Sequence, residues 1–139
     1  MRTGPRAETG NVDAGSFGDE LHLVVPPYSA YLRAVRLVAA DAAARAGLDC
    51  EETDDFRLAV NELCEMMLSE TDHSVFLSFT SVEGSVVARG TTRARGGSNA
   101  ELTSISASIL GTLSDYYTVD VLDGELVFVV ARGGARARR

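Results

Sequence analysis

Two short turns, each between two segments of strand-like pattern, constrain the fold of this chain most strongly. Glu83-Gly84 lies between residues 75–82 and 85–92, and Asp123-Gly124 lies between residues 116–122 and 125–132. In the first pair, apolar side chains alternate with polar ones, as in strands that bury one face. Glycine at such a position allows the backbone of a tight turn. The sequence therefore predicts two β-hairpins.

Three further regions have helical periodicity. Beginning at Tyr28, apolar residues recur at steps of three and four, and Gly47 ends this first helix. Thr53 or Asp54 is expected to cap a second helix that ends near residues 69–72, which leaves Cys50 in the preceding loop. Residues 102–113 are expected to form the third helix.

A short strand is predicted at residues 20–25, before Pro26-Pro27 stops it. The element order is then strand, helix, helix, two strands, helix, two strands. This order predicts an α+β two-layer sandwich, with a mostly antiparallel sheet covered on one face by about three helices. We expect residues 1–19 to be a disordered leader, 20–132 the domain, and 133–139 a basic flexible tail.

Composition limits the classes of function. The 139-residue chain carries a net charge of −7, which argues against general nucleic-acid binding by the folded body. No apolar signal core or membrane-length apolar run occurs, so we expect a cytoplasmic protein with reduced Cys50 and Cys64. The arginines of the tail are interpreted as a solvated end, or alternatively as a contact for an acidic partner or RNA.

One stretch also carries a family resemblance. Asp54-Asp55-Phe-Arg-Leu-Ala-Val-Asn-Glu62-Leu-Cys, with Arg36 and Gly47 before it, resembles the anti-sigma-factor serine kinases. These belong to the histidine-kinase-like ATPases (GHKL, Bergerat fold), and the similarity covers roughly residues 20–132. The resemblance implies a Bergerat-like sandwich of order βααββαββ, together with a site for ATP and magnesium.

The resemblance assigns residues to that site. The general-base glutamate of the family matches Glu62, and the magnesium-binding asparagine falls on Met66, whose thioether is a poor ligand for a hard cation. Asn61 cannot replace it, because it points about 100° away around the helix. Glu70 stands where many members have histidine. Metal binding is therefore not expected.

The loops that bind the nucleotide in the family also differ here from the family pattern. The adenine-reading aspartate falls at about Arg93, and Gly96 and Gly97 are remnants of the nucleotide loop. The mobile lid that covers the nucleotide in the family corresponds here to residues 98–103, which are fewer than the family's usual lid contains. The phosphate-cradling glycines fall on Ser104 and Ser106, whose side chains would crowd a close backbone approach.

The resemblance further implies a partner. Arg36 matches a basic residue of the first helix that members of the family use to contact proteins. We therefore expect a regulator that binds a sigma factor or a STAS-type antagonist without ATP turnover and without a cofactor. The alternatives are an active serine/threonine kinase that uses Glu62, ATP and magnesium, or a scaffold or homodimerisation module. In the structural interpretation, Glu62 is instead a surface residue paired with Arg57 or Arg36.

Overall fold

The computed structural model describes residues 19–98 and 101–133. Its elements follow in the order β2 (Asp19–Val25), η1 (Ser29–Tyr31), α2 (Leu32–Arg45), α3 (Cys50–Leu68), β3 (Val75–Val82), β4 (Ser85–Arg93), α4 (Ser104–Leu113), β5 (Tyr116–Leu122) and β6 (Glu125–Arg132). The expected leader, except for Asp19, and the expected tail, except for Gly133, lie outside the described residues.

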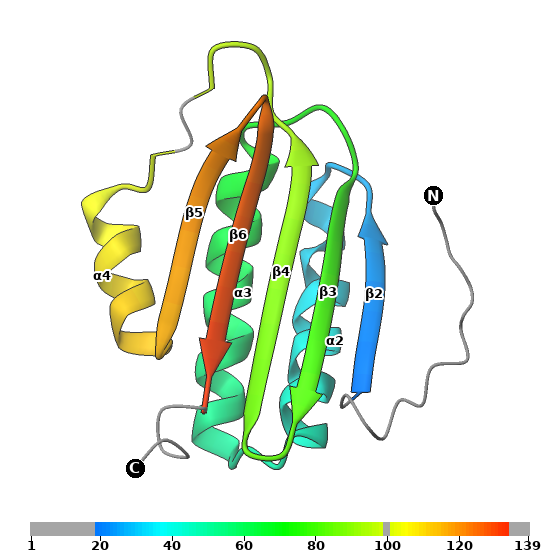
Figure 1. The fold of residues 1–139 in the computed structure, drawn as a ribbon, viewed down its shortest axis with the longest axis vertical. Helices are drawn as coiled ribbons and strands as arrows, with labels where there is room; N and C mark the ends of the chain where they lie inside the picture. Colours follow the sequence, from blue (N-terminus) through cyan, green and yellow to red (C-terminus); the bar gives the residue numbers. More distant parts are fainter. Residues whose placement is uncertain (1–18, 99–100, 134–139) are drawn as a thin grey trace.

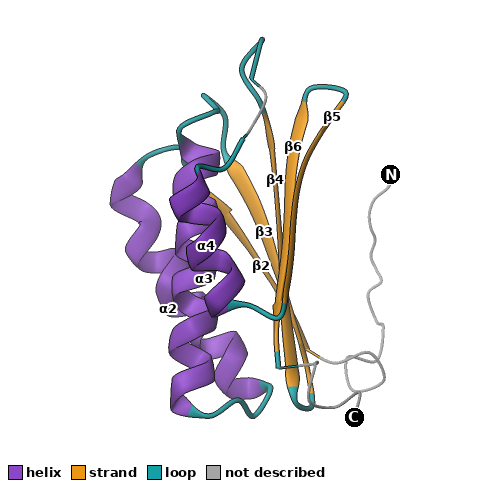
Figure 2. Ribbon diagram, turned by 90° about the vertical axis from the view of Figure 1, so that its left-hand side faces the viewer, coloured by secondary structure: helices purple, strands orange, loops and turns teal. Residues whose placement is uncertain are grey.

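The strands that the structure describes form one five-stranded sheet in the order β2-β3-β4-β6-β5, and every neighbouring pair is antiparallel (Figure 1). The three α-helices among the described residues cover the same face of this sheet (Figure 2). The prediction of an α+β fold with a three-helix layer on an antiparallel sheet is confirmed. Within the described part of the chain, no helix has both the length and the apolar character needed to cross a membrane.

Both predicted hairpins are present, as β3–β4 and β5–β6. Gly84 has φ 83° and Gly124 has φ 80°, and Asp123 before Gly124 also has a positive φ of 53°. Aspartate tolerates this left-handed conformation better than most residues, and glycine adopts it without a steric penalty. These turns fix the register in which each hairpin pairs.

Three helix starts differ from the sequence predictions. The helix α3 is capped by Asp49, not by Thr53 or Asp54, and Cys50 is its first residue rather than part of a loop. The Asp49 carboxylate accepts a hydrogen bond from the Glu52 backbone N–H at 2.8 Å, while the Glu52 carboxylate accepts one from the Asp49 N–H. This reciprocal capping box satisfies two backbone donors at once, so the earlier start is favoured.

The first helix also begins later than expected. A 3₁₀ turn precedes it, and the α-helical part starts at Leu32 rather than at Tyr28. Gly47 follows its end with φ 85°, as predicted. The third helix starts at Ser104, two residues after the predicted position, because the Thr103 side chain caps it by accepting a hydrogen bond from the Ser106 backbone N–H.

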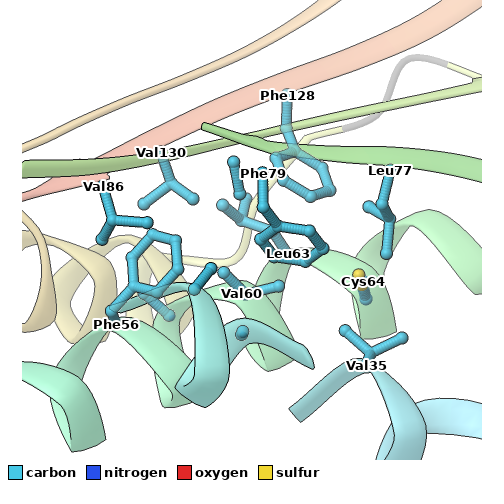
Figure 3. Close-up of a cluster of buried hydrophobic side chains, with 14 of the residues drawn as sticks. Val35, Phe56, Val60, Leu63, Cys64, Leu77, Phe79, Val86, Phe128 and Val130 are labelled. Carbon is cyan, nitrogen blue, oxygen red and sulfur yellow. The ribbon is translucent and has the colours of Figure 1, made fainter. Parts of the chain in front are cut away.

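The core lies between the sheet and the α2–α3 pair (Figure 3). Phe56 of α3 packs edge-on against Phe79 of β3, with ring centroids 6.4 Å apart. Cys64 is buried in the core as predicted, and burial raises the pKa of its thiol to about 12. Other fully buried members are Val35, Val60, Leu63, Met67, Val86, Leu126, Phe128 and Val130.

A partly buried ion cluster fastens the end of β6 to the helix layer. The Arg132 guanidinium lies 2.9 Å from the Asp55 carboxylate of α3 and 3.3 Å from the Asp115 carboxylate before β5. Asp115 also accepts a hydrogen bond from the Gly133 N–H. Between a fifth and a quarter of each of the three charged side chains is exposed, so water screens these pairs only in part.

Candidate functional site

A cavity of about 340 Å³ opens between the C-terminal half of α3 and the start of α4. Figure 1 places α4 at the β5 edge of the sheet and α3 behind β6, and the two helices contact each other. The helix α3 contributes one side of the lining, and the segment leading into α4 contributes the other. The lining residues are Glu62, Glu65, Met66, Ser69, Glu70, Glu101, Leu102, Thr103 and Ser106.

The charge of this cavity is strongly one-sided. Four glutamates are among the described residues that line it, and none of those lining residues is cationic. Carboxylates gathered around a partly enclosed space repel an anion and attract a cation. The arrangement therefore disfavours a polyphosphate ligand.

Glu62 is held by a hydroxyl of the same chain. The Ser106 Oγ donates a hydrogen bond to the Glu62 Oε2 at 2.6 Å, which ties α4 to α3 across the cavity. The expected pairing of Glu62 with Arg57 or Arg36 is wrong. Arg57 instead pairs with Asp54 of the same helix, and Arg36 donates to Asn61.

A second serine–glutamate contact lies at the far end of α3. The Ser98 Oγ donates a hydrogen bond to the Glu70 Oε1 at 2.6 Å. Glu62 lies on α3 and Glu70 lies two residues after the end of α3 at Leu68, so the two contacts hold the chain on either side of the cavity to α3 and to the turn that follows it. Both glutamates thus have partners within the protein.

Arg95 lies next to the site without lining the cavity, and the sequence interpretation did not single it out. Its guanidinium donates to the backbone carbonyls of Ser69 and Thr71, at 2.8 and 3.3 Å, and it lies 3.1 Å from the Asp72 carboxylate. A cation at the C-terminal end of a helix satisfies free carbonyls and complements the negative end of the dipole. An arginine inside a Gly-rich loop next to a helix end was the available signal.

Three of the predicted nucleotide residues, Arg93, Gly96 and Gly97, do not line the cavity. Arg93 is exposed at the end of β4 and pairs in register with Glu125 of β6. Gly96 and Gly97 form an exposed turn in which Gly97 has φ 85°, and a Cβ placed on either glycine would meet open space. These positions are therefore not brought together with Glu62.

Met66 lines the cavity, half-buried and one turn after Glu62, as do Ser106 and residues 101–103 of the predicted lid. Its neighbour Met67 is the core residue of the pair. Within residues 19–98 and 101–133, no group of three or more His, Cys, Asp and Glu side chains is arranged to hold a metal ion. A thioether and an acidic lining do not fit magnesium–ATP, which needs an oxygen ligand and phosphate-binding donors.

The first helix presents a mixed surface on the opposite side of α3. The Arg36 Nη1 donates a hydrogen bond to the Asn61 Oδ1 at 2.9 Å, so the guanidinium is oriented by the second helix. Leu37 beside it is 67% exposed, and Tyr31 and Tyr28 before it are also exposed. Exposed apolar side chains around an oriented arginine are typical of protein-binding surfaces.

Comparison of the sequence with protein-family models gives no match, and comparison with curated proteins gives none either.

Proposed function

We propose that this chain is a cytoplasmic regulator of the anti-sigma type, which binds a sigma factor or a STAS-type antagonist through α2 and does not turn over ATP. The observation that carries the proposal is the cavity beside α3. Where the family resemblance calls for a triphosphate, the lining holds four glutamates and no cation among its described residues. Phosphoryl transfer depends on cations that neutralise developing negative charge, so this lining opposes it.

The α2 surface supports the binding part of the proposal. Arg36 is oriented by its bond to Asn61 before any partner arrives, which lowers the entropic cost of using it in an interface. Leu37 offers an exposed apolar side chain next to it. Arginine is among the side chains that most often dominate interface energies, and an exposed apolar neighbour adds apolar area to bury.

The test mixes the purified chain with purified sigma factors and STAS proteins and measures the binding affinity by calorimetry. Arg36→Ala and Leu37→Ser should each weaken binding by at least tenfold. Arg45→Ala is the matched control, since Arg45 lies at the other end of α2 and is exposed beside Asp41. Failure of every sigma factor and STAS protein to bind would count against the proposal, as would equal effects from the control.

The kinase alternative has one observation in its favour. Glu62 stands at the position of the family base and already accepts a hydrogen bond from a serine hydroxyl, as a general base must. A titration with a fluorescent ATP analogue and magnesium separates the two functions. Two results together would favour the kinase: the analogue binds at micromolar concentration in both the native chain and Glu62→Gln, and the native chain phosphorylates a STAS protein while Glu62→Gln does not. We expect neither nucleotide binding nor phosphorylation.

A further inference from the structure

The helix α4 is unusual in carrying no charge and burying little of its surface. Residues 102–114 contain no Asp, Glu, Lys, Arg or His, and Leu110 is the one fully buried side chain of α4. Ile105 is 72% exposed and Ile109 is 37% exposed, one turn apart on the same face. Adjacent exposed isoleucines cost free energy in water and point to a surface that another molecule covers.

These isoleucines adjoin the acidic cavity. Ile109 lies three residues after Ser106, whose hydroxyl reaches Glu62, so Ser106 and Ile109 lie on the same face of α4. On α3, Leu58 is 42% exposed and lies one turn before Glu62, the residue that Ser106 contacts. We call this region the α3–α4 surface; its members are Leu58, Glu62, Glu65, Glu101, Ile105 and Ile109.

We propose that the α3–α4 surface binds a basic amphipathic helix of a partner protein. Apolar side chains of that helix pack on Ile105 and Ile109, and its lysine or arginine side chains enter the cavity beside Glu62 and Glu65. The inference rests on the proposed protein-binding function and adds a contact distinct from α2.

Charge complementarity identifies the chemistry of the partner. The cavity offers four carboxylates, and none of its described lining residues supplies a cation to neutralise them. A cationic side chain gains attraction there and also finds Met66 and Leu102 for its apolar stem. An acidic helix would face the same carboxylates and be repelled. A volume of about 340 Å³ is large enough for side chains of this size.

The experiment uses the full chain and two synthetic 18-residue helical peptides, which share leucines at helical spacing. One peptide carries lysines on its polar face and the other carries glutamates at the same positions. Fluorescence anisotropy should give micromolar binding of the lysine peptide and none of the glutamate peptide. Ile105→Ser/Ile109→Ser should weaken binding by more than tenfold, and Glu62→Gln/Glu65→Gln should weaken it similarly and flatten its salt dependence.

Val24→Ser on β2 is the matched control, since it removes a 56% exposed apolar residue at the edge of the sheet opposite β5 and should change peptide binding less than twofold. Because peptide binding is measured without a sigma factor, its failure is separate from failure of the α2 proposal. Several outcomes would overturn this inference: no binding at 100 µM peptide, binding indifferent to the isoleucine variants, or binding that appears only after residues 134–139 are deleted. Loss of a dimer in the isoleucine variants without peptide binding would assign the surface to a second copy instead.

Discussion

Replacing Gly90 by alanine should destabilise the fold, because the aromatic ring of a neighbouring strand occupies the space that a Cβ needs. Gly90 lies in β4 and pairs with Leu77 on one side and Phe128 on the other. A Cβ on Gly90 would lie 2.4 Å from the Phe128 Cε2 and 3.0 Å from a Leu77 methyl carbon. Ordinary contacts begin near 3.4 Å, so the ring would have to move by about 1 Å.

The size of the effect follows from the surroundings. Phe128 is fully buried and Leu77 nearly so, which leaves little free volume for the ring to move into. Overpacking of this kind costs about 2–3 kcal/mol, while loss of a strand glycine returns about 0.5–1 kcal/mol. We therefore expect the free energy of unfolding to fall by about 1–2 kcal/mol, and Tm to fall by about 5–10 °C.

Urea unfolding followed by circular dichroism measures this change, and a double-mutant cycle identifies its cause. Phe128→Leu removes the ring atoms that clash, so Gly90→Ala should cost at least 1 kcal/mol less in that background than alone. Gly96→Ala is the control, because a Cβ there would meet nothing within 4 Å. If the costs of Gly90→Ala and Phe128→Leu simply add, the clash explanation is refuted.

Three further perturbations test other parts of the structure. Gly111→Ala should stabilise the protein by about 0.5–1 kcal/mol in thermal unfolding, since Gly111 lies in an exposed part of α4 with open space around its Cβ position; a loss of stability would contradict the described helix. A thiol reagent should modify Cys50 in the native protein and Cys64 only in denaturant. Folding raises the pKa of the Cys64 thiol from 9.0 to about 12, so the contribution of this neutral thiol to the free energy of unfolding should be full below pH 9 and be lost between pH 9 and 12. Arg132→Met should lower the free energy of unfolding by about 2 kcal/mol, and adding Asp55→Asn should then cost less than Asp55→Asn costs alone; equal costs in both backgrounds would show that the pair is not coupled.

Much of the fold was predictable because its signals are local. Alternation of apolar residues with glycine turns predicted β3–β4 and β5–β6, and three- and four-residue periodicity predicted the helices. The start of α3 was missed because Thr53 and Asp54 are also good capping residues. Asp49 caps the helix because its side chain and that of Glu52 each accept a hydrogen bond from the backbone N–H of the other residue. The sequence signal for this capping box was a pair of acidic residues three positions apart.

The candidate site was predictable only in part. The position of Glu62 beside Met66 on one helix follows from their four-residue spacing, and both line the cavity. The partners of Glu62 and Glu70 did not follow, because Ser106 and Ser98 come from segments more than 25 residues away in the chain. Arg93 and the glycines of its loop were expected at the site, yet they lie away from its lining.

Local residue patterns were enough to predict the elements of this protein, their order and the hairpin turns, because these depend on periodicity and on backbone freedom at single residues. Which charged residues lie together depends instead on how the helices pack. Bringing α4 against α3 gathers four glutamates around one cavity and leaves Ile105 and Ile109 exposed beside it. Electrostatic fields and exposed apolar area depend on which distant segments lie close together in the folded protein, and a local sequence pattern does not predict this.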